Sequence, residues 1–307
     1  MNAMITLIRR EIIEHRASWA VTTVFGALFV VAAMLAVVGL VRVGGIGDGM
    51  TVFEFGQGAE AVEISAALKV LFMPMAAVMA SVTTFVVFFY FLDALYAERK
   101  DRSILFWKSL PVSDLRTVAS KYLAGVVAIP LLTILVFLIT GILVWLIGSM
   151  TLLWAGTGAA FTSGPGALAH VTGMLAYLLL VQALWFVPLH GWLLLVSAFA
   201  KRAVLGWALL PPILVVVAER TLLGTTHFAK WLGHRFSGGF ELAFQGDGQG
   251  MTINIEGGQA AEVMVPALGE VLTPGPLLAA PSLWVGIALG LALLAGAVWL
   301  RRWRDES

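Results

Sequence analysis

The chain contains no cysteine among its 307 residues. Disulfides, thiolate metal sites and cysteine nucleophiles are therefore excluded together. Charge is also scarce, because Asp, Glu, Lys and Arg make up 12% of the residues while 60% are hydrophobic. This composition lies far outside the range of soluble globular domains. The formal net charge is only +1, so the whole-chain charge offers no argument for a nucleic-acid partner.

Several catalytic motifs are missing as well. No Gly-Lys dipeptide occurs anywhere, so the chain lacks the phosphate-binding loop that cradles ATP in many nucleotide-binding proteins. There is also no G-x-S-x-G and no H-E-x-x-H sequence. We therefore expect this chain not to be an enzyme and to hold no cofactor of its own.

What the chain does contain is long uncharged apolar runs. A bilayer core about 30 Å thick needs roughly 20 apolar residues for each helical crossing. Six runs are candidates for such crossings: Trp19–Val41, Val70–Leu92, Tyr122–Gly148, Ala167–Ala200, Ala203–Ala218 and Ser282–Leu300. The fourth run is too long for one straight helix, so we expect it to tilt or break, with Pro188 the favoured point. The predicted fold class is an all-α polytopic membrane protein with six transmembrane helices.

The basic residues are divided unevenly between the two sides of this arrangement. Fourteen of the nineteen Lys and Arg residues fall on the side of both termini, and five fall on the other. The positive-inside rule then places both termini in the cytoplasm. The predicted location is a bacterial cytoplasmic (inner) membrane, with membrane lipid around the chain.

The remaining segments suggest a simple division of the chain. Residues 1–17 have apolar residues at helical spacing and are expected to form an interfacial amphipathic helix, or else a basic flank that only sets the topology. Residues 18–220 carry the first five spans, 221–281 an external segment, and 282–307 the sixth span and a cytoplasmic tail. Alternation at Phe240, Leu242 and Phe244, and again over Met251–Ile255, predicts an external β-hairpin that turns at Gln245–Gly250. Thr51–Phe55 could add a strand to it, with a helix following over Ala59–Leu68.

The cytoplasmic loop over residues 93–121 is the most informative segment. It holds six of the nineteen Lys and Arg residues, yet a short apolar cluster, Ile104 to Trp107, lies in its middle. A plain connection has no use for exposed apolar residues between charges, whereas a surface that docks a soluble partner does. The open alternative is a loop helix that lies in the lipid interface without any partner.

This loop resembles a known family. The order E-R-K-D-R-S-I-L-F-W-K-S-L-P-V-S-D, followed by Val118 and Lys121, is similar to the loop after the second span of type-2 ABC transporter permeases. The layout of the whole chain is also similar. The sequence departs from the familiar pattern at Arg102, where that pattern has glycine, and at Trp107.

The resemblance implies that the loop is a coupling helix gripped by a separate ATPase subunit. Two copies of that subunit would bind ATP and Mg, and a second permease protomer, either a homodimer partner or a sister permease, would complete the pathway. The residues that would dock the ATPase are Glu98, Arg99, Asp101, Arg102, Ile104, Leu105, Phe106, Trp107, Lys108, Leu110 and Pro111. The implied function is export of an amphipathic, lipidic or peptide-like substrate.

Polar groups within the spans are the candidates for a substrate path. Ionisable residues are nearly absent from the spans, which argues against a proton-coupled carrier. The candidate path residues are Ser81, Thr83, Thr84, Tyr90, Pro211 and Pro212, although most hydroxyls in spans simply bond their own helix.

Two other functional classes stay open at this stage. One is a membrane enzyme or assembly factor that acts at the external face through His227, His234 and nearby acids. The other is a structural or sensory membrane protein. Co-purification of a nucleotide-binding protein would favour the permease, whereas a metal or hydrolytic activity in the isolated chain would favour the enzyme.

Overall fold

The computed structural model describes residues 3–14, 20–32, 61–101, 112–154, 159–244, 252–256, 259–264 and 268–303. Nearly all of them are helical, because a backbone inside a bilayer must satisfy its own N–H and C=O groups and a helix does so within one segment. The chain first forms α1 (Ala3–Glu14), an apolar helix over Ala20–Ala32, α3 (Ala61–Ala94), α4 (Tyr96–Lys100), α6 (Asp114–Leu123), the π-helical turn η1 (Ala124–Ala128), α7 (Ile129–Trp154), α8 (Ala159–Trp185) and α9 (Val187–Phe199). It continues with α10 (Val204–Ala218), the π-helical turn η2 (Glu219–Leu223), α11 (His227–Ala243), β1 (Thr252–Glu256), β2 (Gln259–Met264), α12 (Leu268–Val271), α13 (Pro274–Ala279) and α14 (Pro281–Trp303).

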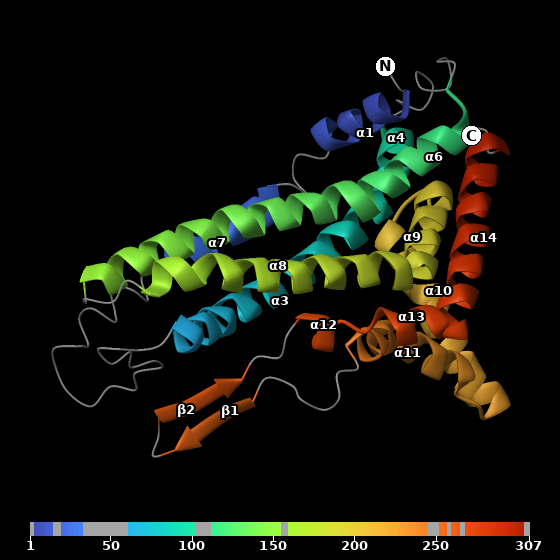
Figure 1. Ribbon diagram of the computed structural model, residues 1–307. Helices are drawn as coiled ribbons and strands as arrows, with labels where there is room; N and C mark the ends of the chain where they lie inside the picture. Colours follow the sequence, from blue (N-terminus) through green and yellow to red (C-terminus); the bar gives the residue numbers. More distant parts are fainter. Residues whose placement is uncertain are drawn as a thin grey trace.

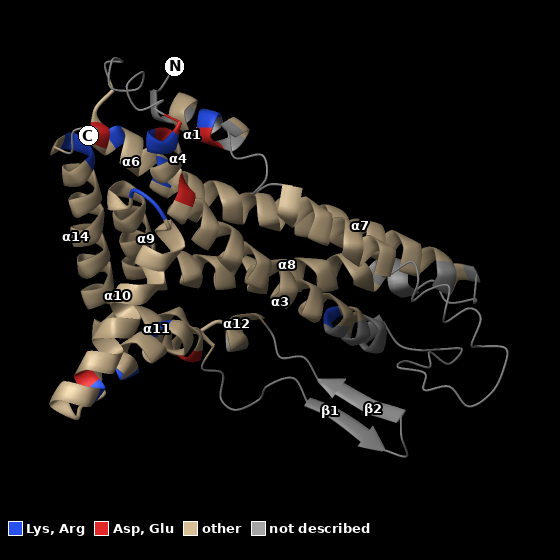
Figure 2. Ribbon diagram, turned by 180° about the vertical axis from the view of Figure 1, so that it is seen from behind, with Lys and Arg blue, Asp and Glu red and all other residues tan. Residues whose placement is uncertain are grey.

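The helices form two groups, which are joined where α8 is followed by α9 (Figure 1). The long helices α3, α7 and α8 pack side by side, and α9 packs along α14 at one end of them. At the foot of α14, α11 and α13 lie together, while α1, α4 and α6 gather at the opposite end beside both termini (Figure 1). Charged residues cluster at that terminal end, and long uncharged stretches of helix follow it (Figure 2).

Among the residues that the structure describes, five helical stretches are long and apolar enough to cross a membrane. They are Leu71–Lys100, Asp114–Met150, Ser163–Trp185, Val204–Leu223 and Pro281–Trp303. Four of these coincide with the second, third, fifth and sixth predicted spans. Of the first predicted span, the structure describes Ala20–Ala32, a shorter apolar helix, and the rest lies outside the described residues. A polytopic helical membrane protein is confirmed, and the count of six stays a prediction.

The fourth predicted span is broken, as its length required. Helix α8 ends at Trp185 and α9 begins at Val187, with Phe186 between them and Pro188 in the first turn of α9. Proline has no N–H to donate to the preceding turn, so a new helix can start at Pro188 but the old one cannot continue through it. The break confirms the prediction made from Pro188.

Glycines allow α9 and α14 to approach each other at the backbone. A Cβ on Gly191 would lie 2.6 Å from the carbonyl oxygen of Gly290, and a Cβ on Gly290 would lie 2.6 Å from the carbonyl carbon and oxygen of Val187. Small residues spaced in this way let membrane helices pack closely where lipid supplies no hydrophobic drive between them. The contact is therefore specified by the absence of side chains on both helices.

Replacing Gly290 by alanine should loosen this contact. The new methyl group would meet backbone atoms that no rotamer change can move, so we expect the free energy of unfolding to fall by about 1–3 kcal/mol. The matched control is Gly166→Ala in α8, where an added Cβ has nothing within 4 Å. Thermal unfolding of both variants in the same detergent checks the prediction. Equal stability of the two would show that the α9–α14 contact can relax freely.

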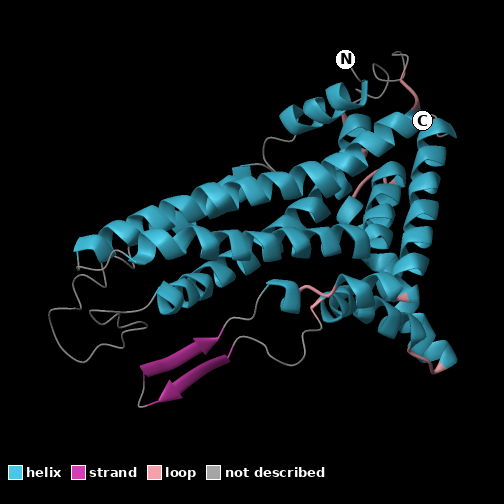
Figure 3. Cartoon of the chain, in the orientation of Figure 1, coloured by secondary structure: helices cyan, strands magenta, loops and turns pink. Residues whose placement is uncertain are grey.

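Residues 252–256 and 259–264 form a β-hairpin, in which β1 falls on the predicted strand Met251–Ile255 but the pairing partner differs from the predicted one. Strand β1 pairs antiparallel with β2, Glu256 opposite Gln259, and the register is irregular between Asn254 and Ile255 (Figure 3). The expected first strand, Phe240 to Phe244, is instead the end of α11. Phe240 packs on Phe186 of the helix break, so a tertiary contact overrides the local alternation. Thr51–Phe55 lies outside the described residues, and of Ala59–Leu68 the part from Ala61 onward belongs to α3.

Candidate functional site

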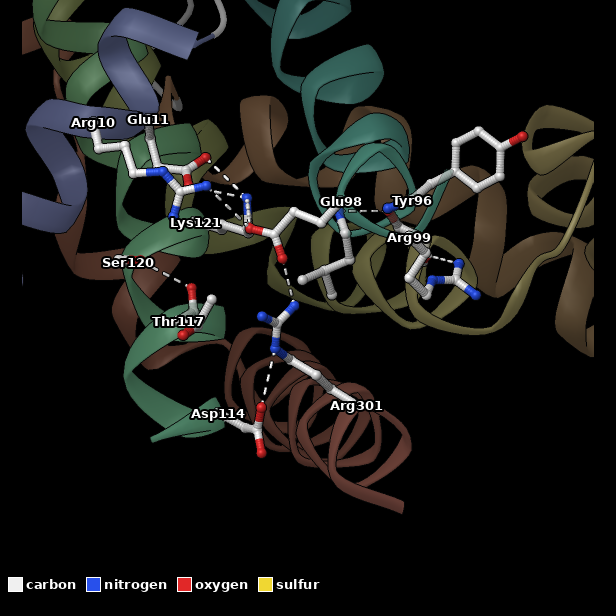
Figure 4. Close-up of polar contacts among 12 residues, drawn as sticks. Arg10, Glu11, Tyr96, Glu98, Arg99, Asp114, Thr117, Ser120, Lys121 and Arg301 are labelled. Carbon is white, nitrogen blue, oxygen red and sulfur yellow. Dashed lines mark hydrogen bonds and ion pairs between the residues drawn. The ribbon is translucent and has the colours of Figure 1, made fainter. Parts of the chain in front are cut away.

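Six charged side chains meet where the two flanks of the loop over residues 93–121 join the helix bundle. We call this group the charge cluster; its members are Arg10, Glu11, Glu98, Asp114, Lys121 and Arg301 (Figure 4). They come from α1, α4, α6 and α14, which are far apart in the sequence. Three are basic and three are acidic, so the cluster is electrically balanced.

Glu98 lies at the centre of the charge cluster. Its Oε2 accepts from Nη1 of Arg301 at 2.6 Å, and its Oε1 lies 3.1 Å from Nζ of Lys121 and 3.6 Å from Nη2 of Arg10. The Glu98 side chain is 5% exposed and that of Lys121 only 1%. Charges removed from water in this way are tolerated only when their partners compensate them closely. The single carboxylate of Glu98 therefore binds α4 to α1, α6 and α14.

A second carboxylate completes the cluster on the N-terminal helix. Nζ of Lys121 donates to both oxygens of Glu11, at 2.9 and 3.1 Å, and the hydroxyl of Tyr90 donates to Oε2 at 3.2 Å. These bonds attach α1 to α3 and α6. The prediction of an N-terminal amphipathic helix is confirmed as a helix, Ala3–Glu14, and the structure adds that it is anchored through a buried charge.

The two ends of the loop are attached to the same arginine. Arg301 pairs with Glu98 before the loop and, through Nε, with Oδ1 of Asp114 after it at 3.1 Å. Asp114 opens α6, whose start is capped by Ser113: its hydroxyl accepts from the backbone N–H of Arg116 at 3.4 Å. The V-S-D of the loop motif is thus a helix start, and it places one carboxylate beside α14.

Arg99 also faces inward. Its Nη2 donates to the carbonyl oxygens of Ser197 and Ala200 at 2.5 and 2.9 Å, and these carbonyls end α9. A cation at a helix C-terminus satisfies carbonyl groups that lack intrahelical donors. In return the hydroxyl of Ser197 accepts from the backbone N–H groups of Leu95 and Tyr96, both at 3.0 Å. The bend before α4 is held against α9 from both sides.

The structure corrects the expected role of Glu98. The sequence suggested that it forms part of an exposed docking rim, but it is buried and bound to three basic side chains. Asp101 is exposed at the end of α4. The other predicted docking residues lie outside the described residues: Arg102, Ile104, Leu105, Phe106, Trp107, Lys108, Leu110 and Pro111.

The candidate path residues do not come together in one place. Thr83 and Thr84 line a small cavity, whereas Ser81 is on an exposed face with its hydroxyl bonded to the carbonyl of Ala77 at 2.9 Å. The hydroxyl of Tyr90 donates to Glu11 of the charge cluster instead. Pro211 and Pro212 lie inside α10, where the indole N–H of Trp192 donates to the carbonyl of Ala208 at 2.9 Å. That carbonyl is the one whose usual donor Pro212 lacks.

The cavity lies between α3, η1 and the broken helix α8–α9, and has a volume of about 30 Å³. Its lining residues are Thr83, Thr84, Val87, Gly125, Val126, Pro130, Leu179, Gln182, Ala183, Phe186 and His190. None of them carries a carboxylate, an ammonium or a guanidinium group. A π-helical turn and a helix break face each other across it, and such irregularities in helices are frequent at functional sites.

A buried arginine joins three helices at the end of the molecule opposite the charge cluster. Arg235 of α11 donates from Nη1 to the carbonyl of Trp185 at 3.3 Å and from Nη2 to the carbonyl of Ser282, and its guanidinium lies 4.6 Å from the centre of the Trp185 ring. The indole N–H of Trp185 donates back to the carbonyl of Arg235 at 2.9 Å. Burial lowers the pKa of the Arg235 guanidinium from its ordinary value, because desolvation disfavours the charged form. The contacts hold α11 to the end of α8 and the start of α14.

His227 and His234 do not form a metal centre in the part of the chain that the structure describes. No group of three or more His, Asp or Glu side chains that could hold a metal ion occurs among those residues. The ring of His234 instead packs edge-on against Trp185, 5.4 Å between centres, and the backbone N–H of His227 donates to Oε1 of Glu219 at 2.5 Å. Glu219 thereby caps the start of α11.

A match to a known protein family covers the loop and the helices on either side of it. Residues 62–186 match the model of a family described as "ABC-2 family transporter protein". This match supports the resemblance of the loop to that of type-2 ABC transporter permeases. The matched part of the chain runs from the beginning of α3 to the α8–α9 break, and so includes the loop, Glu98, Asp114 and Lys121. No curated protein and no solved structure matches the chain.

Sequence reasoning missed the charge cluster as a unit. Glu11 and Lys121 are separated by 110 residues and Glu98 and Arg301 by 203, so no local motif joins them. One signal was present in the sequence: Lys121 and Arg301 adjoin predicted span ends, and Arg10 lies in the N-terminal segment on the same predicted side. Charged residues at the same depth in a helix bundle can form ion pairs. Which of them pair depends on how the helices pack.

Proposed function

We propose that this chain is a type-2 ABC transporter permease, the membrane half of an exporter driven by a separate ATPase, two copies of which dock on the loop around residues 98–111 and hold the ATP and Mg. The exported molecule would be amphipathic, lipidic or peptide-like. Both termini and the loop would face the cytoplasm across a bacterial inner membrane, in line with the uneven distribution of the basic residues.

The observation that carries the proposal is the attachment of both loop flanks to Arg301. A displacement of the loop by a partner would act on Glu98 and Asp114 together, and through Arg301 on the end of α14. Lys121 and Glu11 would extend the same movement to α6 and α1. A loop that only connects two spans has no need of a buried support shared by four helical elements.

A second protomer is part of the proposal because α10 is almost unpacked within one chain. Ala208 is its only buried residue, and apolar side chains are exposed around the rest of the helix. Pro211 also lacks the N–H that would serve the carbonyl of Trp207. Interrupted helices are tolerated at membrane depth where protein or a water-filled cavity covers them. A second permease subunit against α10 would supply that cover.

Purification from native membranes tests this function directly. We expect the tagged permease to co-purify with a nucleotide-binding protein, in a complex whose mass corresponds to two permease and two ATPase subunits. The isolated permease should neither bind nor hydrolyse ATP, because it lacks the glycine-lysine phosphate cradle. Nucleotide binding by the isolated chain, or a hydrolytic activity at its external face without any partner, would favour the membrane-enzyme alternative instead.

A further inference from the structure

We propose that the cavity beside the α8–α9 break is a binding pocket for an uncharged hydrogen-bonding group, such as a hydroxyl or amide at the head of an amphipathic molecule. Its polar side chains are Thr83, Thr84, Gln182 and His190. That such a head belongs to the exported substrate rests on the proposed function, whereas the binding itself does not.

The hydrogen bonds of these side chains leave donors and acceptors uncommitted. The hydroxyl of Thr84 lies 3.0 Å from the carbonyl of Ala80 and 3.2 Å from Oε1 of Gln182, but its single proton can serve only one of these acceptors. No described residue accepts from the amide nitrogen of Gln182. Thr83 is different, because its hydroxyl is 2.7 Å from that of Thr133 and 2.8 Å from the carbonyl of Met79.

His190 provides the strongest sign that a ligand belongs here. It is 8% exposed, and its Nδ1 has no hydrogen-bond partner among the described residues. Three aromatic rings lie close to it, with ring centres 4.9 Å away for Phe91, 6.3 Å for Phe186 and 6.4 Å for Tyr122. Burying a polar nitrogen without a partner is costly, so an unsatisfied one beside a cavity points to a group that the pocket receives.

The pocket selects against charge. Among its lining residues there is no ionic side chain, and an unpaired charge inside a bilayer would be expensive to bury. A water molecule needs at least about 10–15 Å³, so a pocket of about 30 Å³ admits one small head group or roughly two waters. Five of its lining residues are only half-buried, and we take them as its rim: Thr84, Val126, Pro130, Gln182 and Ala183. An apolar tail would extend past this rim into the surroundings of the helices.

The absence of cysteine makes the pocket directly testable, because a single introduced cysteine is the only thiol. Ala183→Cys reports on the pocket without removing a hydrogen-bonding group. Phe89→Cys, at a residue that is 56% exposed on the apolar surface of α3, is the lipid-facing control, and Lys230→Cys on exposed α11 is the water-facing reference. The three variants are purified without an ATPase and reconstituted in phosphatidylcholine bilayers. They are then treated with a small water-soluble thiol reagent.

We expect Ala183→Cys to react at least about tenfold faster than Phe89→Cys, because the reactive thiolate forms only in contact with water. Octanol should slow the reaction at Ala183→Cys by about threefold once it reaches twice its dissociation constant. Octanoate and octylammonium have the same tail but a charged head, and they should not slow it. None of the three should change the rate at Lys230→Cys.

A second substitution separates binding from access. Gln182→Leu in the Ala183→Cys chain should abolish the protection by octanol while labelling continues, and an unchanged elution profile shows that the chain still folds. Adding diacylglycerol to the bilayer distinguishes the source of the head group. Protection by it as well assigns the pocket to neutral lipid, and protection by octanol alone assigns it to a smaller molecule.

Three results would overturn the proposal. Labelling at Ala183→Cys as slow as at Phe89→Cys would mean that the pocket is dry. Equal protection by octanol and octylammonium would mean that no neutral head group is recognised, and so would protection that survives Gln182→Leu. None of these results depends on the ATPase, so a failure here is distinguishable from a failure of the proposed function.

Discussion

Replacing Glu98 by alanine is expected to lower the free energy of unfolding by about 3–5 kcal/mol, the cost typical of removing one partner from a buried ion pair. Three buried or half-buried basic side chains, Arg10, Lys121 and Arg301, would then face two carboxylates instead of three. Most of the cost comes from the cations left in a poorly solvated site, and little from the lost contact itself. Thermal unfolding of the purified permease measures the effect.

Two further variants provide a control and a rescue for the effect of Glu98→Ala. Glu241→Ala removes an exposed carboxylate from α11 and should change the stability by no more than about 0.5 kcal/mol. Combining Glu98→Leu with Lys121→Met restores the charge balance with apolar side chains of similar size, so it should recover at least about 1 kcal/mol relative to Glu98→Ala. If Glu98→Ala unfolded at the temperature of Glu241→Ala, the cluster would not be a structural support.

The second large effect concerns the loop itself. Changing Phe106 and Trp107 together to alanine should release the ATPase or uncouple it from transport. Each large apolar side chain costs roughly 1.5–3 kcal/mol when it is exposed to water, so a pocket on the partner is its expected destination. Interface residues of this kind contribute about 2 kcal/mol or more each. A combined loss of about 4 kcal/mol corresponds to roughly a thousandfold weaker association.

A matched double variant tests whether the position matters or only the apolar area. Leu115→Ala with Trp303→Ala removes two exposed apolar side chains at the same end of the molecule but outside residues 98–111. Both double variants should reach the membrane at normal levels, and only Phe106→Ala with Trp107→Ala should lose ATPase association and substrate-stimulated turnover. Unchanged values for that variant would mean that this loop is not the coupling element.

These two predictions concern two parts of the proposed coupling region, its buried support and its docking surface. Glu98 and Arg301 support the loop from inside, where burial makes charge pairing strong and its loss costly. Phe106 and Trp107 would meet the partner from outside, with Asp101, Arg102 and Lys108 orienting the approach more than adding affinity. The proposal therefore predicts a stability defect for one set of variants and an assembly defect without a stability defect for the other.

Helical spans were the part of the structure most accessible from sequence, and Pro188 shows why. A run of more than thirty apolar residues cannot be one crossing, and proline marks where a helix can begin anew. The predicted hairpin at Phe240–Phe244 failed for the opposite reason. Its alternation was short, and contact with Phe186 drew the segment into α11. A local sequence pattern predicts the secondary structure reliably where solvent or the bilayer imposes that pattern. It predicts poorly where a single tertiary contact determines which structure forms.

By itself, the sequence determined that this is a helical membrane protein without catalytic or nucleotide-binding motifs, and that its loop resembles that of an ABC permease. Those properties follow from composition and from short motifs. Only the tertiary structure decided that Glu98 points inward, that Arg301 joins both loop flanks, and that His190 faces a neutral cavity with Gln182. Pairings across 110 to 203 residues depend on which helices lie side by side, and local sequence carries no record of that choice.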